Sequence, residues 1–158
     1  MKRNLKYIGS FMLGICIGSA LWLKLQQGCI RRLKESADKN YGLFILMDQW
    51  VNMKQDGKRI EEYFDRNHFK KIAIYGMGYV GQRLIKELKG TGIEVLYGID
   101  RNAKNLHSEV KLVTAEEPLT KVDAIVITTM CDVDEIVHTL SEKVDCTIIA
   151  IEDILNEI

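Results

Sequence analysis

The chain has 158 residues, with 22 lysines and arginines, 22 aspartates and glutamates, and 47% hydrophobic residues. This length suits one domain and leaves no room for a nucleotide-binding domain followed by a complete substrate domain. The apolar content excludes a disordered chain, and the zero net charge argues against binding to nucleic acid, which requires a basic surface.

The spacing of the cysteines limits which kinds of site the protein can contain. The four cysteines, at positions 16, 29, 131 and 146, lack the close spacing of a zinc-binding or redox pair, so we predict no metal site. Reduced thiols in a reducing compartment are the simpler interpretation.

Residues 1–24 contain four basic residues and no acidic ones, which leaves 18 basic against 22 acidic residues in the rest. This remainder has the composition of an ordinary acidic soluble domain.

The first predicted element is an apolar segment. Residues 7–23 read YIGSFMLGICIGSALWL, seventeen uncharged residues with a lysine on each side. This is the lower limit of helix length for crossing a hydrocarbon core of about 30 Å. Tyr7 and Trp22 lie near the two ends, where interfacial aromatic side chains occur in membrane helices. We therefore predict a transmembrane helix that makes residues 1–28 a membrane anchor.

A cleaved signal peptide and a buried soluble helix remain alternatives for this segment. The start MKRNLK resembles the basic region of a signal peptide, whereas the Leu-Trp-Leu that follows Ala20 does not resemble a polar mature start. Ser10, Gly14 and Gly18 recur every four residues, a pattern that allows membrane helices to pair and a homo-oligomer to form. Basic residues on both sides leave the orientation open under the positive-inside rule.

A helical lead-in, residues 29–68, is expected before the first strand. In residues 29–55, apolar side chains recur at approximately helical spacing and polar side chains take the other side. Asp56-Gly57 marks the end of this helix, because glycine tolerates the left-handed conformation that ends helices. A short second helix is predicted over residues 59–67. We expect this helical pair to pack on its own domain, with a partner-binding surface as the alternative.

A glycine motif follows the first predicted strand, residues 72–75. Its six residues, Gly76-Met77-Gly78-Tyr79-Val80-Gly81, lead into an amphipathic helix, and all six are candidates for cofactor binding. This is GxGxxG between a strand and a helix, the context in which the motif binds the pyrophosphate of a dinucleotide. The first glycine permits the tight turn, the second lets the phosphates approach the backbone, and the third lets the helix lie close to the strand. Amides at the helix N-terminus would donate hydrogen bonds to the phosphates.

The second predicted strand, residues 94–99, ends at Asp100, nineteen residues after Gly81. An acidic residue at this distance accepts hydrogen bonds from the adenosine ribose in dinucleotide-binding domains. Arg101 beside it is instead suited to the 2′-phosphate of NADP. We therefore predict NAD as the cofactor and keep NADP as the alternative. A Rossmann-like unit with an empty site is a further alternative.

The remaining segments continue the alternation of strands and helices. Strands are predicted at residues 110–113, 122–128 and 147–151, and a helix at residues 132–141. Right-handed crossovers then give a parallel sheet in the order 3-2-1-4-5. Residues 101–109 are too few for a full helix between the second and third strands. The predicted fold is thus α/β, a reduced Rossmann-like domain of about five strands over residues 69–158.

Ligands of such sheets bind at the carboxyl ends of the strands. At the end of the fourth predicted strand, Thr128 and Thr129 are candidates for contact with the nicotinamide ribose or a substrate. Thr128 fits an ordinary strand residue equally well. The edge predicted to hold the cofactor therefore combines these threonines with the glycine motif, Asp100 and Arg101.

We predict no catalytic residue at this edge. A dehydrogenase needs a proton donor or acceptor near the carbon that exchanges hydride. His68, His107 and His138 fall at other positions of the expected fold, and no tyrosine is followed four residues later by a lysine. Cys131, just after the fourth predicted strand, is the only well-placed candidate nucleophile.

The stretch from Tyr41 through Asp100 resembles a Rossmann-type NAD(P)-binding module found in bacterial surface-polysaccharide gene clusters. The resemblance is carried by Trp50, Asp56-Gly57-Lys58, Tyr63-Phe64, IAIYGMGYVGQRLIKEL at residues 72–88, and Gly98-Ile99-Asp100. That module occurs alone or fused to glycosyltransferases, and it is similar to the nucleotide-binding part of nucleoside-diphosphate-sugar epimerases and dehydratases. The catalytic dyad and the sugar-binding half of those enzymes are missing from this sequence.

The resemblance implies a nucleotide-binding accessory or sensor protein of glycan assembly. We expect it to be anchored in the membrane through residues 7–23, with its soluble domain facing the cytoplasm, where free dinucleotide is abundant. Its expected partners are a dinucleotide and a glycosyltransferase or sugar-modifying enzyme. One alternative is a small NAD-dependent oxidoreductase or nucleotide-sugar-modifying subunit that completes its site across an oligomer. Another is a domain that holds a nucleotide-sugar or coenzyme A.

Overall fold

The computed structural model describes the backbone of residues 2–158 and the side chains of residue 22, residue 24 and residues 26–158. The chain divides into two compact units, Met1–Gly42 and Leu43–Ile158. Apart from Trp22, the predicted membrane span lies outside the residues whose side chains are described. Within the described residues, no helix has both the length and the apolar character needed to cross a bilayer.

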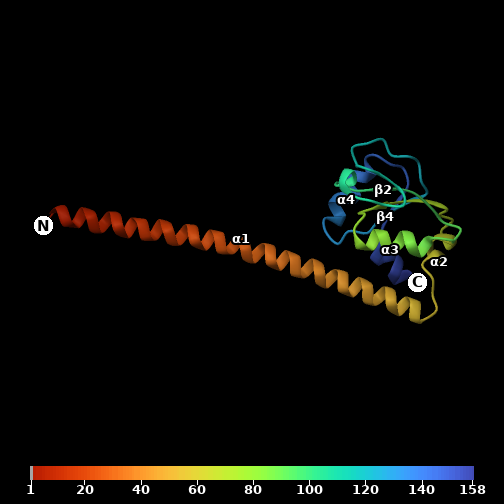
Figure 1. The fold of residues 1–158 in the computed structure, drawn as a ribbon, viewed down its shortest axis with the longest axis horizontal. Helices are drawn as coiled ribbons and strands as arrows, with labels where there is room; N and C mark the ends of the chain where they lie inside the picture. Colours follow the sequence, from red (N-terminus) through yellow and green to blue (C-terminus); the bar gives the residue numbers. More distant parts are fainter. Residues whose placement is uncertain (1) are drawn as a thin grey trace. The chain divides into compact units, whose positions relative to one another are not determined.

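Two helices precede the sheet. Helix α1 (Lys2–Gln55) is continuous and ends where the sequence predicts (Figure 1). The end is closed by Gly57, whose φ is +74°, and by a hydrogen bond of 3.1 Å from the Lys58 amide to the Met53 carbonyl. A glycine in the left-handed region typically ends a helix in this way. Helix α2 (Glu61–Arg66) confirms the short second helix.

The described part of the second unit contains one parallel sheet. Its strands are β1 (Lys71–Tyr75), β2 (Glu94–Ile99), β3 (Lys111–Val113), β4 (Ala124–Ile127) and β5 (Thr147–Ala150). Their order is β3-β2-β1-β4-β5, and every neighbouring pair is parallel, which confirms the predicted sheet. The bounds of β2 are as predicted, and the ends of the other strands differ from the prediction by at most two residues.

Helices cover both faces of this sheet (Figure 1). On one face, α3 (Tyr79–Leu88), α5 (Ile151–Glu157), α2 and the last turns of α1 form a core with the side chains of Ile72 and Ile74. On the other face, α4 (Val133–Ser141) packs on Ala73 and Tyr75. Strand β1 is therefore buried on both sides, which explains why it reads as a continuous apolar run.

Two connections show what local patterns can and cannot predict. Between β2 and β3 the described chain has only the 3-10 helix η1 (Ala103–Asn105). This confirms the prediction of a reduced Rossmann-like domain that lacks a full helix between these two strands. Helix α5 is not predicted by the sequence analysis, which extends the last strand to Ile151. That residue instead begins α5, and it is buried together with Ile154 and Leu155. Seven residues are too few for helical periodicity to be recognised.

Candidate functional site

The glycine loop begins at the carboxyl end of β1. Gly76 has a φ of +94°, in the region that favours glycine. Its amide donates a hydrogen bond of 2.8 Å to the carbonyl of Ile99, the last residue of β2. Two residues later the chain enters α3, with Gly78 at the N-cap position. The loop therefore starts between two central strands and ends as the first turn of a helix.

The second and third glycines of the motif have different surroundings. A Cβ atom on Gly78 would meet no atom within 4 Å, so this position opens onto free space. A Cβ atom on Gly81 would lie 2.4 Å from the carbonyl oxygen of Gly76 and 3.1 Å from Oγ1 of Thr128. Gly81 is therefore needed for α3 to pack on the loop, whereas Gly78 leaves room for a ligand beside the backbone.

The N-terminus of α3 offers hydrogen-bond donors. No side chain caps it, and the bond from the Gln82 amide to the Gly78 carbonyl measures 3.1 Å. The amides that precede Gln82 in the first turn therefore have no carbonyl acceptor within the helix. Such amides, together with the helix dipole, favour a phosphate group at this position. The open space at Gly78 lies at the same helix end, so the site fits the pyrophosphate of a dinucleotide.

Asp100, which follows β2, is hydrogen-bonded to the glycine loop. Its Oδ2 accepts a hydrogen bond of 2.8 Å from the Met77 amide, and its Oδ1 accepts one of 2.8 Å from the Asn102 amide. A carboxylate has about four acceptor positions, so each oxygen retains capacity for a ribose hydroxyl. The structure thus brings Asp100 and the loop together, as predicted. Asp100 also holds the loop in place through the Met77 amide, a role that the sequence analysis does not anticipate.

Arg101 lies at the same edge, beside Tyr75. The neighbouring Tyr75 hydroxyl is the main reason that the pKa of Arg101 is raised above its ordinary value, and the charges of Asp132 and Glu135 act in the same direction. These partners belong to β1 and to the start of α4. Arg101 therefore lies near the start of α4, and its guanidinium stays charged.

The two threonines after β4 are placed differently. Thr128 is buried, and its hydroxyl lies within hydrogen-bond distance of the carbonyl oxygens of Tyr75 and Gly76, at 3.0 and 2.5 Å. Its hydroxyl hydrogen is therefore directed to the glycine loop. Thr129 is half-buried, and its Oγ1 accepts a long hydrogen bond of 3.4 Å from the Cys131 amide. Both residues lie at the predicted edge, but only Thr129 keeps its side chain partly exposed.

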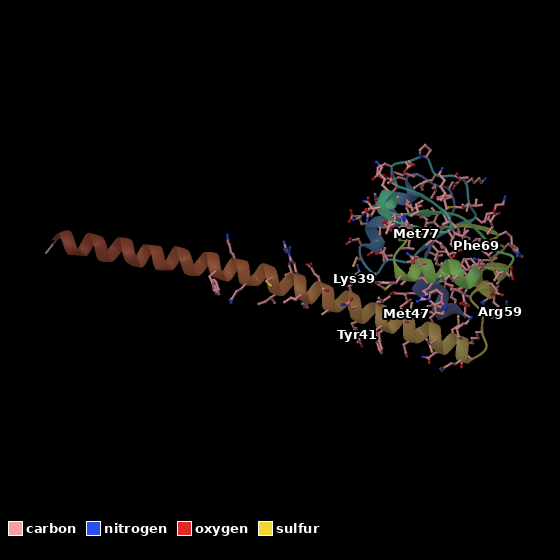
Figure 2. All side chains as sticks on the ribbon, viewed as in Figure 1. Lys39, Tyr41, Met47, Arg59, Phe69 and Met77 are labelled. Carbon is pink, nitrogen blue, oxygen red and sulfur yellow. The ribbon has the colours of Figure 1, made fainter. Side chains whose placement is uncertain are left out.

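The other residues of the glycine motif also differ in exposure. Met77 is 1% exposed and lies inside the α/β domain (Figure 2). Its Sδ would be 2.6 Å from a Cβ on Gly98, so the glycine in β2 makes room for it. Glycine inside a strand often marks such a close approach, and Gly98 is the sequence signal that could have indicated it. Val80 is buried toward the core, whereas Tyr79 is 82% exposed.

The remaining candidates lie elsewhere. His68 is exposed and precedes β1 at the opposite edge, His107 is exposed after η1, and His138 is exposed on α4. Cys131 is a free, exposed thiol between β4 and α4. Among the described residues, no group of three or more His, Cys, Asp or Glu side chains is arranged to hold a metal ion.

Fold and site together define a Rossmann-type dinucleotide-binding domain. Comparison with family models shows that residues 43–143 match the NAD binding domain of D-isomer specific 2-hydroxyacid dehydrogenases, and the chain belongs to this family. The match includes the glycine loop, Asp100 and β4. NAD(H) is therefore the cofactor of this domain. Comparisons with curated proteins and with solved structures gave no match.

Proposed function

We propose that this protein is a membrane-anchored NAD(H)-binding accessory protein that works beside an enzyme of surface-glycan assembly. The binding function rests on the uncapped N-terminus of α3, where Gly78 opens onto free space. The anchor is supported by the seventeen uncharged residues 7–23, and the link to glycans by the resemblance over residues 41–100. The domain faces the cytoplasm in this proposal, because free dinucleotide is abundant there.

The cofactor is held at three places in this proposal. The first-turn amides of α3 bind the pyrophosphate, and Asp100 accepts hydrogen bonds from the adenosine ribose. Arg101 and Thr129 border the ligand on the side of α4. Bound NAD supplies a hydride acceptor, and NADH a hydride donor. Thr128 acts through the loop: its hydroxyl fixes the Gly76 carbonyl and so positions the amides that follow.

The accessory role is supported by the residues at the carboxyl edge. The described histidines are exposed at other positions, and the sequence contains no Tyr-Lys pair of the type used by sugar-modifying enzymes of this fold. A dehydrogenase requires an acid–base residue beside the nicotinamide. A module that senses the NAD/NADH ratio, or presents the cofactor to a partner enzyme, has no such requirement.

A second candidate is an NAD-dependent oxidoreductase that completes its site across an oligomer. The family to which the chain belongs favours it, because the matching domain is that of 2-hydroxyacid dehydrogenases. The purified full-length protein should be incubated with NAD and D-lactate, and the absorbance of NADH followed. Turnover proportional to protein concentration would support this candidate and contradict the accessory role.

Calorimetric titration of the full-length chain with NAD, NADH, NADPH and a nucleotide-sugar tests the binding function. We expect micromolar binding of NAD or NADH, equivalent to about −8 kcal/mol. Gly78→Val should abolish NAD and NADH binding, because its side chain occupies the free space where the phosphates are expected. The midpoint temperature of thermal unfolding should stay nearly unchanged, because a Cβ at this position meets no other atom within 4 Å. Asp100→Ala should weaken it about tenfold, the effect of losing a hydrogen bond to a charged group.

Gly92→Val is the matched control for Gly78→Val. A Cβ on Gly92 has its nearest atom, Nζ of Lys70, at 3.8 Å, and the residue precedes β2 at the opposite edge. NAD affinity should therefore be unchanged in this variant. Failure of the unaltered protein to bind either NAD or NADH, or equal affinity in Gly78→Val, would refute the assignment of the site.

A further inference from the structure

The part of helix α1 that belongs to the first unit carries exposed apolar side chains. Every side chain from residue 26 to residue 41 is exposed. Ile30 and Leu33 are 64% and 65% exposed, and Tyr41, labelled in Figure 2, is 68% exposed. A lone helix cannot bury its own apolar side and gains most of its stability by packing that side on another element. These side chains therefore need a partner outside the described part of the first unit.

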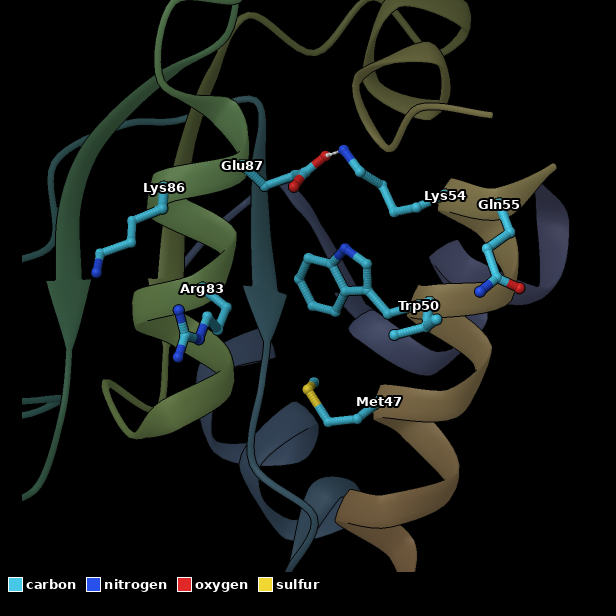
Figure 3. A pocket seen from close by; sticks show the side chains of 8 residues that line it. Met47, Trp50, Lys54, Gln55, Arg83, Lys86 and Glu87 are labelled. Carbon is cyan, nitrogen blue, oxygen red and sulfur yellow. Dashed lines mark hydrogen bonds and ion pairs between the residues drawn. The ribbon is translucent and has the colours of Figure 1, made fainter. Parts of the chain in front are cut away.

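In the second unit, the α/β domain covers one side of α1. Trp50 is 7% exposed and points toward α3, and Lys54 forms an ion pair with Glu87 of that helix (Figure 3). Phe44 and Val51 lie on the other side of α1, and they remain 64% and 52% exposed. The second unit thus leaves apolar side chains of its own part of α1 uncovered.

Apolar residues of α1 recur in a seven-residue repeat. The repeat has two series, Ile30, Ala37, Phe44 and Val51 in the first and Leu33, Asn40 and Met47 in the second. Six of these seven residues, which we call the heptad stripe, are apolar. The stripe spans about three heptads, the length at which such a repeat indicates a coiled coil. Isoleucine or valine in the first series and leucine in the second favour a pair of parallel helices.

Charged residues lie outside the heptad stripe. The residues that flank it in the first unit are Cys29, Lys34, Ser36 and Tyr41. Only Lys34 is charged, and in a parallel pair it faces Cys29 of the other copy, so no like charges oppose each other. Arg31 and Glu35 take outer positions and pair with each other within the helix at 3.3 Å. The matching element must therefore present an uncharged apolar side with the same repeat, and α1 of a second copy does so.

We propose that the heptad stripe joins two copies of this chain in a parallel coiled coil of their α1 helices. Asn40 is the one polar residue of the stripe, and a single polar residue in such a core fixes the register of the helices. The parallel direction also rests on the proposed function, because two copies anchored in one membrane through residues 7–23 share one orientation. The pairing itself requires neither the anchor nor bound NAD.

Disulfide cross-linking of the full-length chain in dodecyl maltoside tests the proposal. The four native cysteines are replaced by serine, and Ile30→Cys, Ala37→Cys or Glu35→Cys adds a single thiol. Copper phenanthroline and dissolved oxygen then take two electrons and two protons from a pair of thiols, and an S–S bond forms. We expect dimers from Ile30→Cys and Ala37→Cys but not from Glu35→Cys. A disulfide requires Cα atoms within about 7 Å, a distance reached by core positions of paired helices and not by outer ones.

A variant of the stripe completes the test. In the chain with Ile30→Cys, Leu33→Gln should slow cross-linking about tenfold or more, because each copy loses a buried leucine while glutamine keeps the helix. Glu35→Gln places the same residue outside the stripe and should have no effect. Circular dichroism should show the same unfolding midpoint of the α/β domain in both variants.

Three results would overturn the proposal. They are equal cross-linking at the positions of Ile30 and Glu35, dimers from only one or neither of the two stripe positions, and unchanged cross-linking in Leu33→Gln. Calorimetric titration with NAD and sedimentation with membranes are separate measurements, so a failure of the proposed function is distinguished from a failure of this pairing.

Discussion

Three glycines of one motif have three separate physical reasons to be glycine. Gly76 adopts a positive φ, Gly78 borders free space, and Gly81 lies against the carbonyl of Gly76. Only the first and third are demanded by the fold itself. Stability and cofactor binding can therefore be changed independently within six residues of sequence.

This separation leads to a prediction for Gly81→Ala. Its Cβ would lie 2.4 Å from a backbone oxygen, so α3 must move away from the loop. We expect the free energy of unfolding to fall by about 1–3 kcal/mol, as for other overpacked positions. Urea unfolding followed by circular dichroism measures this. Gly78→Ala is the control and should change stability by less than about 1 kcal/mol. Equal losses in the two variants would contradict the argument.

At the scale of elements, Asp123 joins the beginnings of β1 and β4. Its Oδ2 accepts hydrogen bonds of 2.8 and 2.7 Å from the amides of Lys70 and Lys71. These bonds, the Lys71 one first, lower the pKa of Asp123 below its ordinary value. Because the unfolded chain then binds a proton at higher pH than the folded one does, the carboxylate stabilises the fold above the ordinary pKa of about 3.9.

The pH dependence of stability follows from this lowered pKa of Asp123 in the folded chain. Stability due to Asp123 should be lost as the pH falls below about 4 and through the lowered pKa of the folded state. Urea midpoints measured between about pH 6 and about pH 3 should therefore fall less steeply in Asp123→Asn than in the unaltered chain. The exposed residue Asp134 provides the control variant Asp134→Asn. An unchanged slope in Asp123→Asn would show that these hydrogen bonds do not contribute.

At the scale of the whole molecule, cysteine labelling can test the proposed membrane anchor and its orientation. Cys131 is exposed, whereas Cys146 is half-buried and its pKa is raised, mainly by burial. A thiol with a raised pKa reacts more slowly with maleimides, because the thiolate is the nucleophile. Cys131 is therefore a suitable reporter for testing on which side of a membrane the proposed anchor places the domain.

We expect the full-length chain to sediment with membranes. In a variant that keeps only Cys131, a membrane-impermeant maleimide should label the chain only after the cells are permeabilised. Ile15→Arg combined with Ile17→Arg should release the protein into the soluble fraction, because charged side chains cost about 2.5–3.5 kcal/mol each at the centre of a membrane helix. Labelling in intact cells would contradict the cytoplasmic orientation.

The sequence by itself determined the elements whose causes are local. The apolar run of β1, the glycine motif after it and the distance to Asp100 predict the strand, the turn, the helix and the NAD site, because spacing along the chain is enough to specify them. The sheet order follows from the same units and the right-handedness of their crossovers.

Only the tertiary structure decided the contacts between distant residues. Asp100 holds the Met77 amide, Thr128 fixes the Gly76 carbonyl, and Trp50 comes to lie beside α3 across more than thirty positions of sequence. A seven-residue helix such as α5 is likewise recognised only when its apolar side chains are seen to be buried. Such contacts arise from burial and hydrogen bonding between elements brought together by packing, and no local pattern encodes them.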